Sequence, residues 1–142
     1  PAARAVRVEA PVRGGHETVL DAEDDDDVRR LARRVLEGQG YAVLEAPDAA
    51  TALRLAAGHT GPIDLLLTDV VMPEMPGTEL ARRLGDARPG TRVLYVSGYT
   101  DDSVIRNGAL PTGTSFLQKP FTATALARRV RHVLDAEAAA AR

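Results

Sequence analysis

Short runs of apolar residues alternate along the chain with stretches in which apolar residues recur at every third or fourth position. A short apolar run bounded by polar or turn residues predicts a buried strand, whereas the wider spacing predicts an amphipathic helix. We expect five strands, at residues 18–20, 41–44, 63–68, 92–96 and 115–118. The third run, IDLLLT, is apolar enough to be buried on both faces of a sheet.

Helical spacing follows each of these runs and predicts five helices. In four of them the apolar positions lie at residues 28–36, 49–56, 80–84 and 126–134. The remaining one, the fourth along the chain, is short and runs through residue 105. Asp48 and Thr122 precede the second and the last helix and can cap them, because their side chains accept hydrogen bonds from the first backbone N–H groups. Gly77 starts the third helix, and Thr100 or Asp101 can cap the fourth.

Five strand–helix units joined by short connections predict an α/β fold, a parallel sheet with helices on both faces. Ligands of such sheets bind beyond the carboxyl ends of the strands, near the point where the strand order reverses. The 142 residues suit one domain, which we place at residues 16–136. We interpret residues 1–15, which end in Gly-Gly, as a tail or linker, and residues 137–142 as a C-terminal tail.

Composition narrows the kind of protein. Aromatic residues make up only 4% of the chain, so the core must be aliphatic. There is no Cys, which excludes disulfides, thiolate metal sites and thiol nucleophiles. The net charge of −2 gives no general attraction to nucleic acid or membranes. No apolar run is long enough to span a bilayer or resembles a secretory signal, so we expect a soluble, cytoplasmic protein.

Charged and hydroxyl side chains follow four of the five predicted strands. The first strand ends in Glu23 and Asp24, the third in Asp69, the fourth in Ser97 and the fifth in Lys119, the only lysine of the chain. Each fits an ordinary role by itself, such as a solvated acidic loop, a helix cap or a turn. Because parallel strands end at the same edge of a sheet, we expect the five side chains to meet there.

The chemistry of this set points to phosphoryl transfer. Clustered carboxylates repel one another unless a cation lies between them. Oxygen ligands without Cys favour Mg²⁺, which binds one or two carboxylates together with a phosphate oxygen. A carboxylate oxygen of Asp69 could then attack phosphorus and form an acyl phosphate. Lys119 and the hydroxyl of Ser97 would hold the phosphoryl oxygens, since such transfer depends mainly on positioning and charge.

Three motifs carry a resemblance to a known family. They are LLLTDVVMPEMPG at residues 65–77, VSGY at 96–99 and FLQKPF at 116–121, in addition to the acidic pair. Over about residues 17–134 the chain resembles the receiver domain of two-component response regulators. The motif at residues 65–77 and the sequence VLYVSGYT at residues 93–100 look most like receivers attached to hybrid sensor histidine kinases. The resemblance implies a flavodoxin-like (CheY-like), doubly wound sheet with strand order 2-1-3-4-5.

The resemblance also implies roles for individual residues. Asp69 is the residue phosphorylated by a histidine kinase or a phosphotransfer protein. Asp24 and Asp69 bind Mg²⁺ directly, together with the backbone carbonyl of Val71, and Glu23 helps through water. Lys119 pairs with Asp69 or with a phosphoryl oxygen.

A second group of implied roles concerns signalling. Ser97 moves toward the phosphoryl group, and Phe116 is the switch aromatic. The peptide bond between Lys119 and Pro120 is expected to be cis. The fourth helix, fifth strand and fifth helix form the output and homodimerisation surface. We expect output to go through protein contacts or through a neighbouring domain of a longer parent chain, without direct binding to nucleic acid or membranes.

The first strand departs from the family pattern at Asp21, where an aliphatic residue is usual. A buried carboxylate is costly and tends to take up a proton. We expect either that Asp21 points into the acidic pocket or that the strand bulges at this position. This departure favours an alternative function, a degenerate receiver that binds proteins without phosphorylation.

Two classes of enzyme fit less well. Phosphatases of the haloacid-dehalogenase type place a second Asp two residues after the nucleophile, where this chain has Val71. No Gly-rich phosphate loop follows the first strand, which argues against a nucleotide-binding enzyme. We interpret the arginine pairs, including Arg29-Arg30 and Arg33-Arg34 of the first helix, as solvated helix faces, with a docking role for the first helix as a second possibility.

Overall fold

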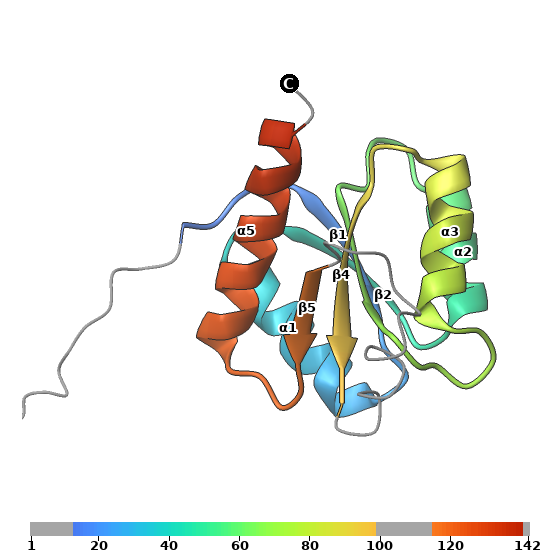
Figure 1. Cartoon of the computed structure of the whole chain (residues 1–142), viewed down its shortest axis with the longest axis horizontal. Coiled ribbons are helices and arrows are strands. Elements are labelled where there is room, and N and C mark those ends of the chain that lie inside the picture. Colours follow the sequence, from blue (N-terminus) through green and yellow to red (C-terminus); the bar gives the residue numbers. More distant parts are fainter. Residues whose placement is uncertain (1–12, 99–114, 141–142) are drawn as a thin grey trace, which may run out of the picture.

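The computed structural model describes residues 13–98 and 115–140 of the chain (Figure 1). Within them, five parallel strands form one sheet in the order β2-β1-β3-β4-β5, which confirms the predicted fold. The strands are β1 (Thr18–Ala22), β2 (Ala42–Ala46), β3 (Leu65–Asp69), β4 (Arg92–Ser97) and β5 (Ser115–Gln118). The order reverses between β1 and β3, so the carboxyl ends of these two strands flank the expected ligand position.

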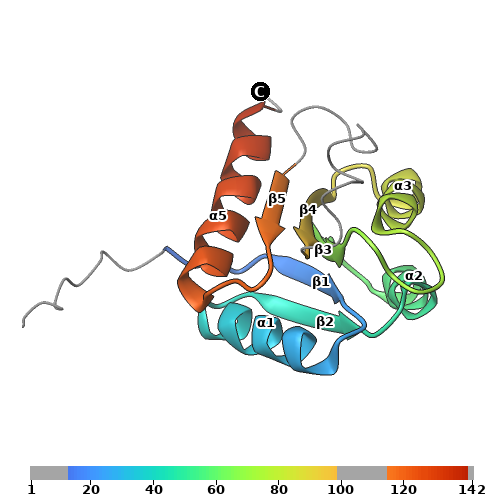
Figure 2. The ribbon, with the colours of Figure 1, turned by 60° about the horizontal axis from the view of Figure 1, so that its bottom comes forward.

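Helices cover both faces of the sheet. They are α1 (Asp26–Gly38), α2 (Ala49–Gly58), α3 (Gly77–Ala87) and α5 (Ala123–Ala140). Figure 2 shows α1 and α5 on one side and α2 and α3 on the other. Each pair buries its own aliphatic cluster against the sheet, one around Leu36 and Leu126 and the other around Leu66 and Leu80. The predicted short fourth helix lies outside the described residues, and no described helix is long and apolar enough to cross a bilayer.

The helix caps at Asp48 and Thr122 follow the sequence prediction, and four of the five strands differ from their predicted bounds by one or two residues. Asp48 accepts a hydrogen bond from the backbone N–H of Thr51 at 2.7 Å, and Thr122 caps α5 in the same way at 3.0 Å. The third strand begins at Leu65 instead of residue 63, and the carboxylate of Asp64, directly before it, accepts a hydrogen bond from the backbone N–H of Thr18. All five residues of β3 are buried, as its apolar run predicted.

Asp21 lies within a regular strand, so the predicted bulge is wrong. It pairs in register with Glu45 of β2 and with Leu67 of β3. Its side chain borders the same small cavity as Glu23 and Asp69, as the other alternative required. Asp21 is only 1% exposed, and its Oδ2 atom accepts no hydrogen bond. Burial, together with the charges of Glu23 and Glu45, raises the pKa of Asp21 to about 8, against the opposing effect of Arg29.

We predict that Asp21→Leu stabilises the fold in metal-free buffer. Asp21 must take up a proton on folding at neutral pH, because its pKa rises from 3.8 to about 8. Each pKa unit corresponds to about 1.4 kcal/mol, and pH 7 lies about three units above the unfolded pKa, so we expect a gain on the order of 4 kcal/mol at pH 7. Below the unfolded pKa of 3.8 the carboxyl of Asp21 is protonated in both states, so its burial costs no proton uptake. The folded state loses stability as pH rises from there toward the folded pKa of about 8. The gain should therefore shrink as pH falls toward 4.

Urea unfolding of Asp21→Leu and wild type across this pH range, with a chelator present, measures the difference. Asp21→Asn is the matched control, since it keeps the shape and removes the titration but leaves a buried amide without partners. It should gain less than Asp21→Leu. A stabilisation by Asp21→Leu that is the same at both ends of the pH range would contradict the assigned cause.

Arg131 of α5 ties the segment before β1 to its own helix. Its guanidinium donates to Glu17 at 2.8 and 3.1 Å, to Asp135 at 3.0 Å and to the carbonyl of Gly14 at 3.2 Å. The hydrogen bond from Arg131 lowers the pKa of Glu17 to about 2, against an opposing effect of burial. The segment before β1 is thereby held against α5.

The lowered pKa of Glu17 predicts how the stability of the fold changes as pH falls. The stability that Glu17 contributes is present above its ordinary pKa of 4.5 and is lost as pH falls toward 2. Glu17→Gln should therefore unfold at lower urea concentration at neutral pH and should show a flatter pH dependence in that acid range. Glu37→Gln, which removes an exposed acid on α1, is the control. Parallel acid profiles for Glu17→Gln and wild type would rule out the pairing as the cause.

Candidate functional site

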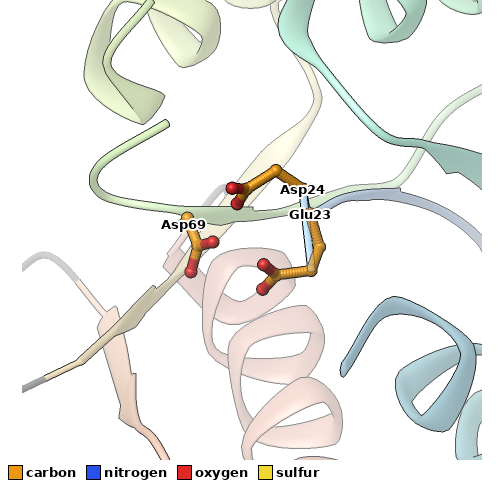
Figure 3. A group of neighbouring side chains, drawn as sticks. All are labelled: Glu23, Asp24 and Asp69. Atoms are coloured by element: carbon orange, nitrogen blue, oxygen red, sulfur yellow. The ribbon is translucent and has the colours of Figure 1, made fainter. Parts of the chain in front are cut away.

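Three carboxylates meet where β1 and β3 end (Figure 3). Glu23 and Asp24 directly follow β1, and Asp69 is the last residue of β3. One carboxylate oxygen from each lies within 4.8 Å of the other two. Glu23 and Asp69 are each 4% exposed, whereas Asp24 is exposed to solvent. The predicted convergence of these three residues is thus present in the structure.

The acidic run divides its side chains between the site and the start of α1. The carboxylate of Glu23 accepts a hydrogen bond from the backbone N–H of Asp25 at 3.0 Å. Asp25 is the N-cap of α1 and accepts from the N–H groups of Asp27 and Val28. The backbone N–H of Glu23 donates to the carbonyl of Ala46, which ties the loop to β2. Helix capping therefore bends the chain so that Glu23 and Asp24 face Asp69.

Lys119 supplies the positive charge at this cluster. Its Nζ atom lies 3.0 Å from Asp69 Oδ1 and 3.1 Å from Glu23 Oε1. The residue follows β5, and its backbone N–H donates to the carbonyl of Ser97 at 2.8 Å. The peptide bond between Lys119 and Pro120 is cis. Burial alone would lower the pKa of Lys119, but pairing with Asp69 and Glu23 raises it above its ordinary value, so the amine stays charged.

The electrostatics of the cluster favour a further cation. Burial raises the pKa of Asp69, and the nearby carboxyl of Glu23 raises it more, against the opposing effect of Lys119. Asp69 Oδ1 is buried and is paired with the ammonium of Lys119 at 3.0 Å without a well-directed hydrogen bond. One ammonium cannot neutralise three carboxylates, and the available ligand atoms are all oxygens. These properties fit Mg²⁺, a hard cation that prefers carboxylates and water.

The other predicted site residues lie around the same strand ends. Ser97 is the last residue of β4, 3% exposed, and comes one position after Val96, which pairs with Asp69. Val71 lies two residues past Asp69, and 53% of its surface is exposed. Phe116 lies on β5, where its ring centroid is 6.3 Å from that of Tyr95. Ser97 is thus placed beside Asp69, whereas Phe116 lies farther back along the sheet.

Gly77 brings the start of α3 against the backbone of Asp69. A Cβ atom added to Gly77 would lie 1.8 Å from the carbonyl oxygen of Asp69, which is closer than any packing allows. The backbone N–H of Gly77 donates to the carbonyl of Val70 at 2.8 Å. The sequence indicated Gly77 only as a helix start. Its second role, leaving room for the Asp69 peptide, depends on a tertiary contact.

Arg29 corrects the interpretation of the arginine pairs. We expected a solvated helix face, but Arg29 is 9% exposed, whereas Arg30 and Arg33 are exposed. Its Nη1 atom donates to the carbonyl oxygen of Glu23 at 2.9 Å. A signal was available, because Arg29 lies three and seven positions before Ala32 and Leu36, which are on the buried side of α1.

Comparison with known proteins gives consistent matches. A family model described as the response regulator receiver domain matches residues 19–131. Sensor kinase CckA of Brucella abortus is 39% identical over 135 residues, which are 94% of this chain and 14% of CckA. Response regulator receiver protein CpdR of Brucella abortus is 36% identical, over 83% of this chain and 97% of CpdR.

Solved structures agree with these sequence matches. The crystal structure of the receiver domain from hybrid histidine kinase CckA superposes with a TM-score of 0.69 at 36% identity. The superposition covers 82% of this chain and 98% of that domain. The similarity therefore extends over nearly all of a receiver domain but over only a small part of the full CckA kinase.

Proposed function

Because the chain belongs to the response regulator receiver domain family of two-component systems, we propose that Asp69 accepts a phosphoryl group from a phosphohistidine. The donor is a histidine kinase or a phosphotransfer protein. One observation carries the proposal: Asp69, buried at the end of β3, lies within reach of Lys119, Glu23 and Asp24. This set combines a nucleophile, a positive charge and the ligands of a divalent cation.

The transfer is a substitution at phosphorus. A carboxylate oxygen of Asp69 forms a bond to phosphorus while the bond from phosphorus to the histidine nitrogen breaks, which leaves an aspartyl phosphate. Asp24, Asp69 and the backbone carbonyl of Val71 would hold Mg²⁺, with Glu23 acting through water. When bound, the cation offsets the negative charge of the phosphoryl oxygens. Lys119 and the Ser97 hydroxyl hold the remaining oxygens.

Phosphorylation then acts as a switch in this proposal. It adds nearly two negative charges at Asp69, which attract Ser97 and Lys119. Phe116 repacks in response, and the surface that includes β5 and α5 changes its affinity for protein partners, a second copy of the chain among them. We place this activity in the cytoplasm and in a domain over residues 16–136. The parent chain is a hybrid kinase or a stand-alone regulator.

An apolar hollow beside the site is suited to the phosphodonor. It has a volume of about 650 Å³ and is lined by Val28 and Leu31 of α1 and by Lys119, Pro120 and Phe121. Its position next to Lys119 lets an apolar helix face dock while a histidine reaches Asp69. This supports α1 as the docking element, with its apolar side chains rather than its arginines making the contact.

A degenerate receiver is the alternative function. The buried Asp21 favours it, because such a residue is unusual in a central strand. The presence of Asp69, Ser97 and Lys119 opposes it, since protein binding alone does not require this set. The two functions differ in whether Asp69 reacts.

Acetyl phosphate, a small phosphodonor, tests the proposal without the unknown kinase. The wild-type chain is incubated with it in Mg²⁺ or in a chelator, and intact mass spectrometry follows the product. We expect one added phosphoryl group per chain that is sensitive to hydroxylamine, as acyl phosphates are, and strongly reduced by the chelator. Absence of the adduct together with absence of beryllofluoride binding in Mg²⁺ would favour the degenerate receiver.

A further inference from the structure

Arg29 connects the acidic loop, defined as residues 23–25, to two neighbouring elements. Its guanidinium donates from three nitrogens to three acceptors. Nη1 contacts the carbonyl oxygen of Glu23 at 2.9 Å, Nη2 the carboxylate of Asp26 at 2.7 Å, and Nε the carboxylate of Glu45 at 3.3 Å. The acceptors belong to the acidic loop, to α1 and to β2 respectively. The side chain is 11% exposed, so these contacts are largely shielded from water.

These contacts fix the peptide group between Glu23 and Asp24. A peptide group is planar, so the direction of the Glu23 carbonyl determines the direction in which the chain enters Asp24. The N–H of Glu23 is already held by the carbonyl of Ala46. With Arg29 on the carbonyl, the backbone on both sides of the Glu23 side chain is restrained. The direction in which the chain enters Asp24, the proposed direct cation ligand of the loop, therefore depends on this guanidinium.

We propose that Arg29 is a positioning residue for cation binding, which it promotes by holding the acidic loop in its ligating conformation. The inference rests on the proposed function, since it concerns the same site. Arg29 does not touch the reacting atoms and acts through the Glu23 carbonyl. Lysine could not replace it, because an ammonium lacks the planar fork that reaches three separate acceptors.

The charge of Arg29 would have the opposite effect. A positive side chain behind the acidic loop repels a divalent cation, so if charge alone mattered, its removal would strengthen Mg²⁺ binding. If positioning dominates, its removal weakens binding. The two effects change the Mg²⁺ affinity in opposite directions, so the direction of the measured change distinguishes them.

Mg²⁺ titration of the metal-free protein, followed by isothermal calorimetry and by the backbone amide resonances of Glu23 and Asp24, provides the test. For Arg29→Gln we expect at least about 10-fold weaker Mg²⁺ binding, the usual effect of losing a group that orients metal ligands. Arg29→Lys should be weakened as well, although it keeps the charge. The amide resonances of the acidic loop should shift in both variants even before Mg²⁺ is added.

Arg33→Gln is the matched control. Arg33 lies one turn further along α1, pairs with Glu45 at 2.6 Å and with Glu37 at 3.1 Å, and is about half exposed. Removing it deletes one positive charge, as Arg29→Gln does, and a contact to the same β2 residue, Glu45. We expect Mg²⁺ affinity in Arg33→Gln to be unchanged or slightly stronger than in wild type.

Phosphorylation from acetyl phosphate separates positioning from a general structural defect. Arg29→Gln should be slow at low Mg²⁺ and should recover the wild-type rate at saturating Mg²⁺. If a variant does not fold in buffer alone, all titrations are repeated in trimethylamine N-oxide, which favours the folded state. Mg²⁺ affinity equal to or stronger than wild type in folded Arg29→Gln overturns the inference but leaves the proposed function intact. Failure of the wild type itself to bind Mg²⁺ overturns the proposed function.

Discussion

Asp69→Asn is expected to abolish phosphorylation of the chain by acetyl phosphate and by a cognate histidine kinase. The amide has nearly the same shape as the carboxylate, but it is not a nucleophile toward phosphorus, so no acyl phosphate can form. The variant should keep its fold. Burial and Glu23 raise the pKa of Asp69, so the ionised carboxylate is costly in the folded state, and the substitution removes this cost. In a chelator, the variant should be at least as stable as wild type.

Intact mass and labelled-phosphate incorporation check this prediction in parallel with urea unfolding. Asp86→Asn, which changes a solvent-exposed carboxylate on α3, is the matched control and should incorporate phosphate normally. Loss of incorporation in a folded Asp69→Asn protein assigns the reaction to this residue. Labelling of Asp69→Asn at the wild-type level would refute the assignment.

Lys119→Met is expected to slow phosphorylation of Asp69 by about 100- to 1000-fold, the usual effect of removing one preorganised charged donor. The amine is 3.0 Å from Asp69 and 3.1 Å from Glu23, so it is already in place where charge develops on the phosphoryl group. Methionine keeps the length and the apolar stem of the side chain but provides no charge. The initial rate with acetyl phosphate at saturating Mg²⁺ measures the effect.

Lys119→Arg serves as the companion variant. It keeps the positive charge, but the larger planar guanidinium cannot occupy the same point between two carboxylates. We expect an intermediate rate, faster than Lys119→Met and slower than wild type. Wild-type rates in a folded Lys119→Met protein would show that the amine is not part of the reaction and would require another cation to hold the phosphoryl oxygens.

The fold was predictable because its information is local and repeated. Each buried strand of the sheet is a short apolar run, and each helix has apolar residues at its own spacing, so the alternation alone indicates a parallel α/β sheet. Capping residues such as Asp48 and Thr122 mark the helix starts for the same local reason. The strand order and the family followed from motifs, not from periodicity.

Much of the candidate site was predictable as well, because parallel topology brings all carboxyl ends of the strands to one edge. Asp69, Ser97 and Lys119 are far apart in sequence, yet each directly follows or ends an apolar run. Once the sheet is parallel, these residues have to be near one another. Position at a strand end is a property that sequence alone can indicate.

Roles that depend on contacts between elements were not predictable. Helical spacing places Arg29, but not Arg30, on the buried side of α1. Its contacts with the Glu23 carbonyl and with Glu45 of β2 appear only in the tertiary structure. Gly77 is a helix start in sequence, and its closeness to the Asp69 carbonyl appears only when α3 packs beside β3.

By itself, then, the sequence determined the class of fold, the edge of the sheet that forms the candidate site and the residues placed there. The spacing of apolar residues and the position of a residue at a strand end both depend only on residues that are neighbours along the chain. Only the tertiary structure decided that Asp21 is buried without a hydrogen bond at Oδ2 and that Arg29 holds the acidic loop from behind. These outcomes depend on which side chains from distant segments share a small volume, and that is set by packing.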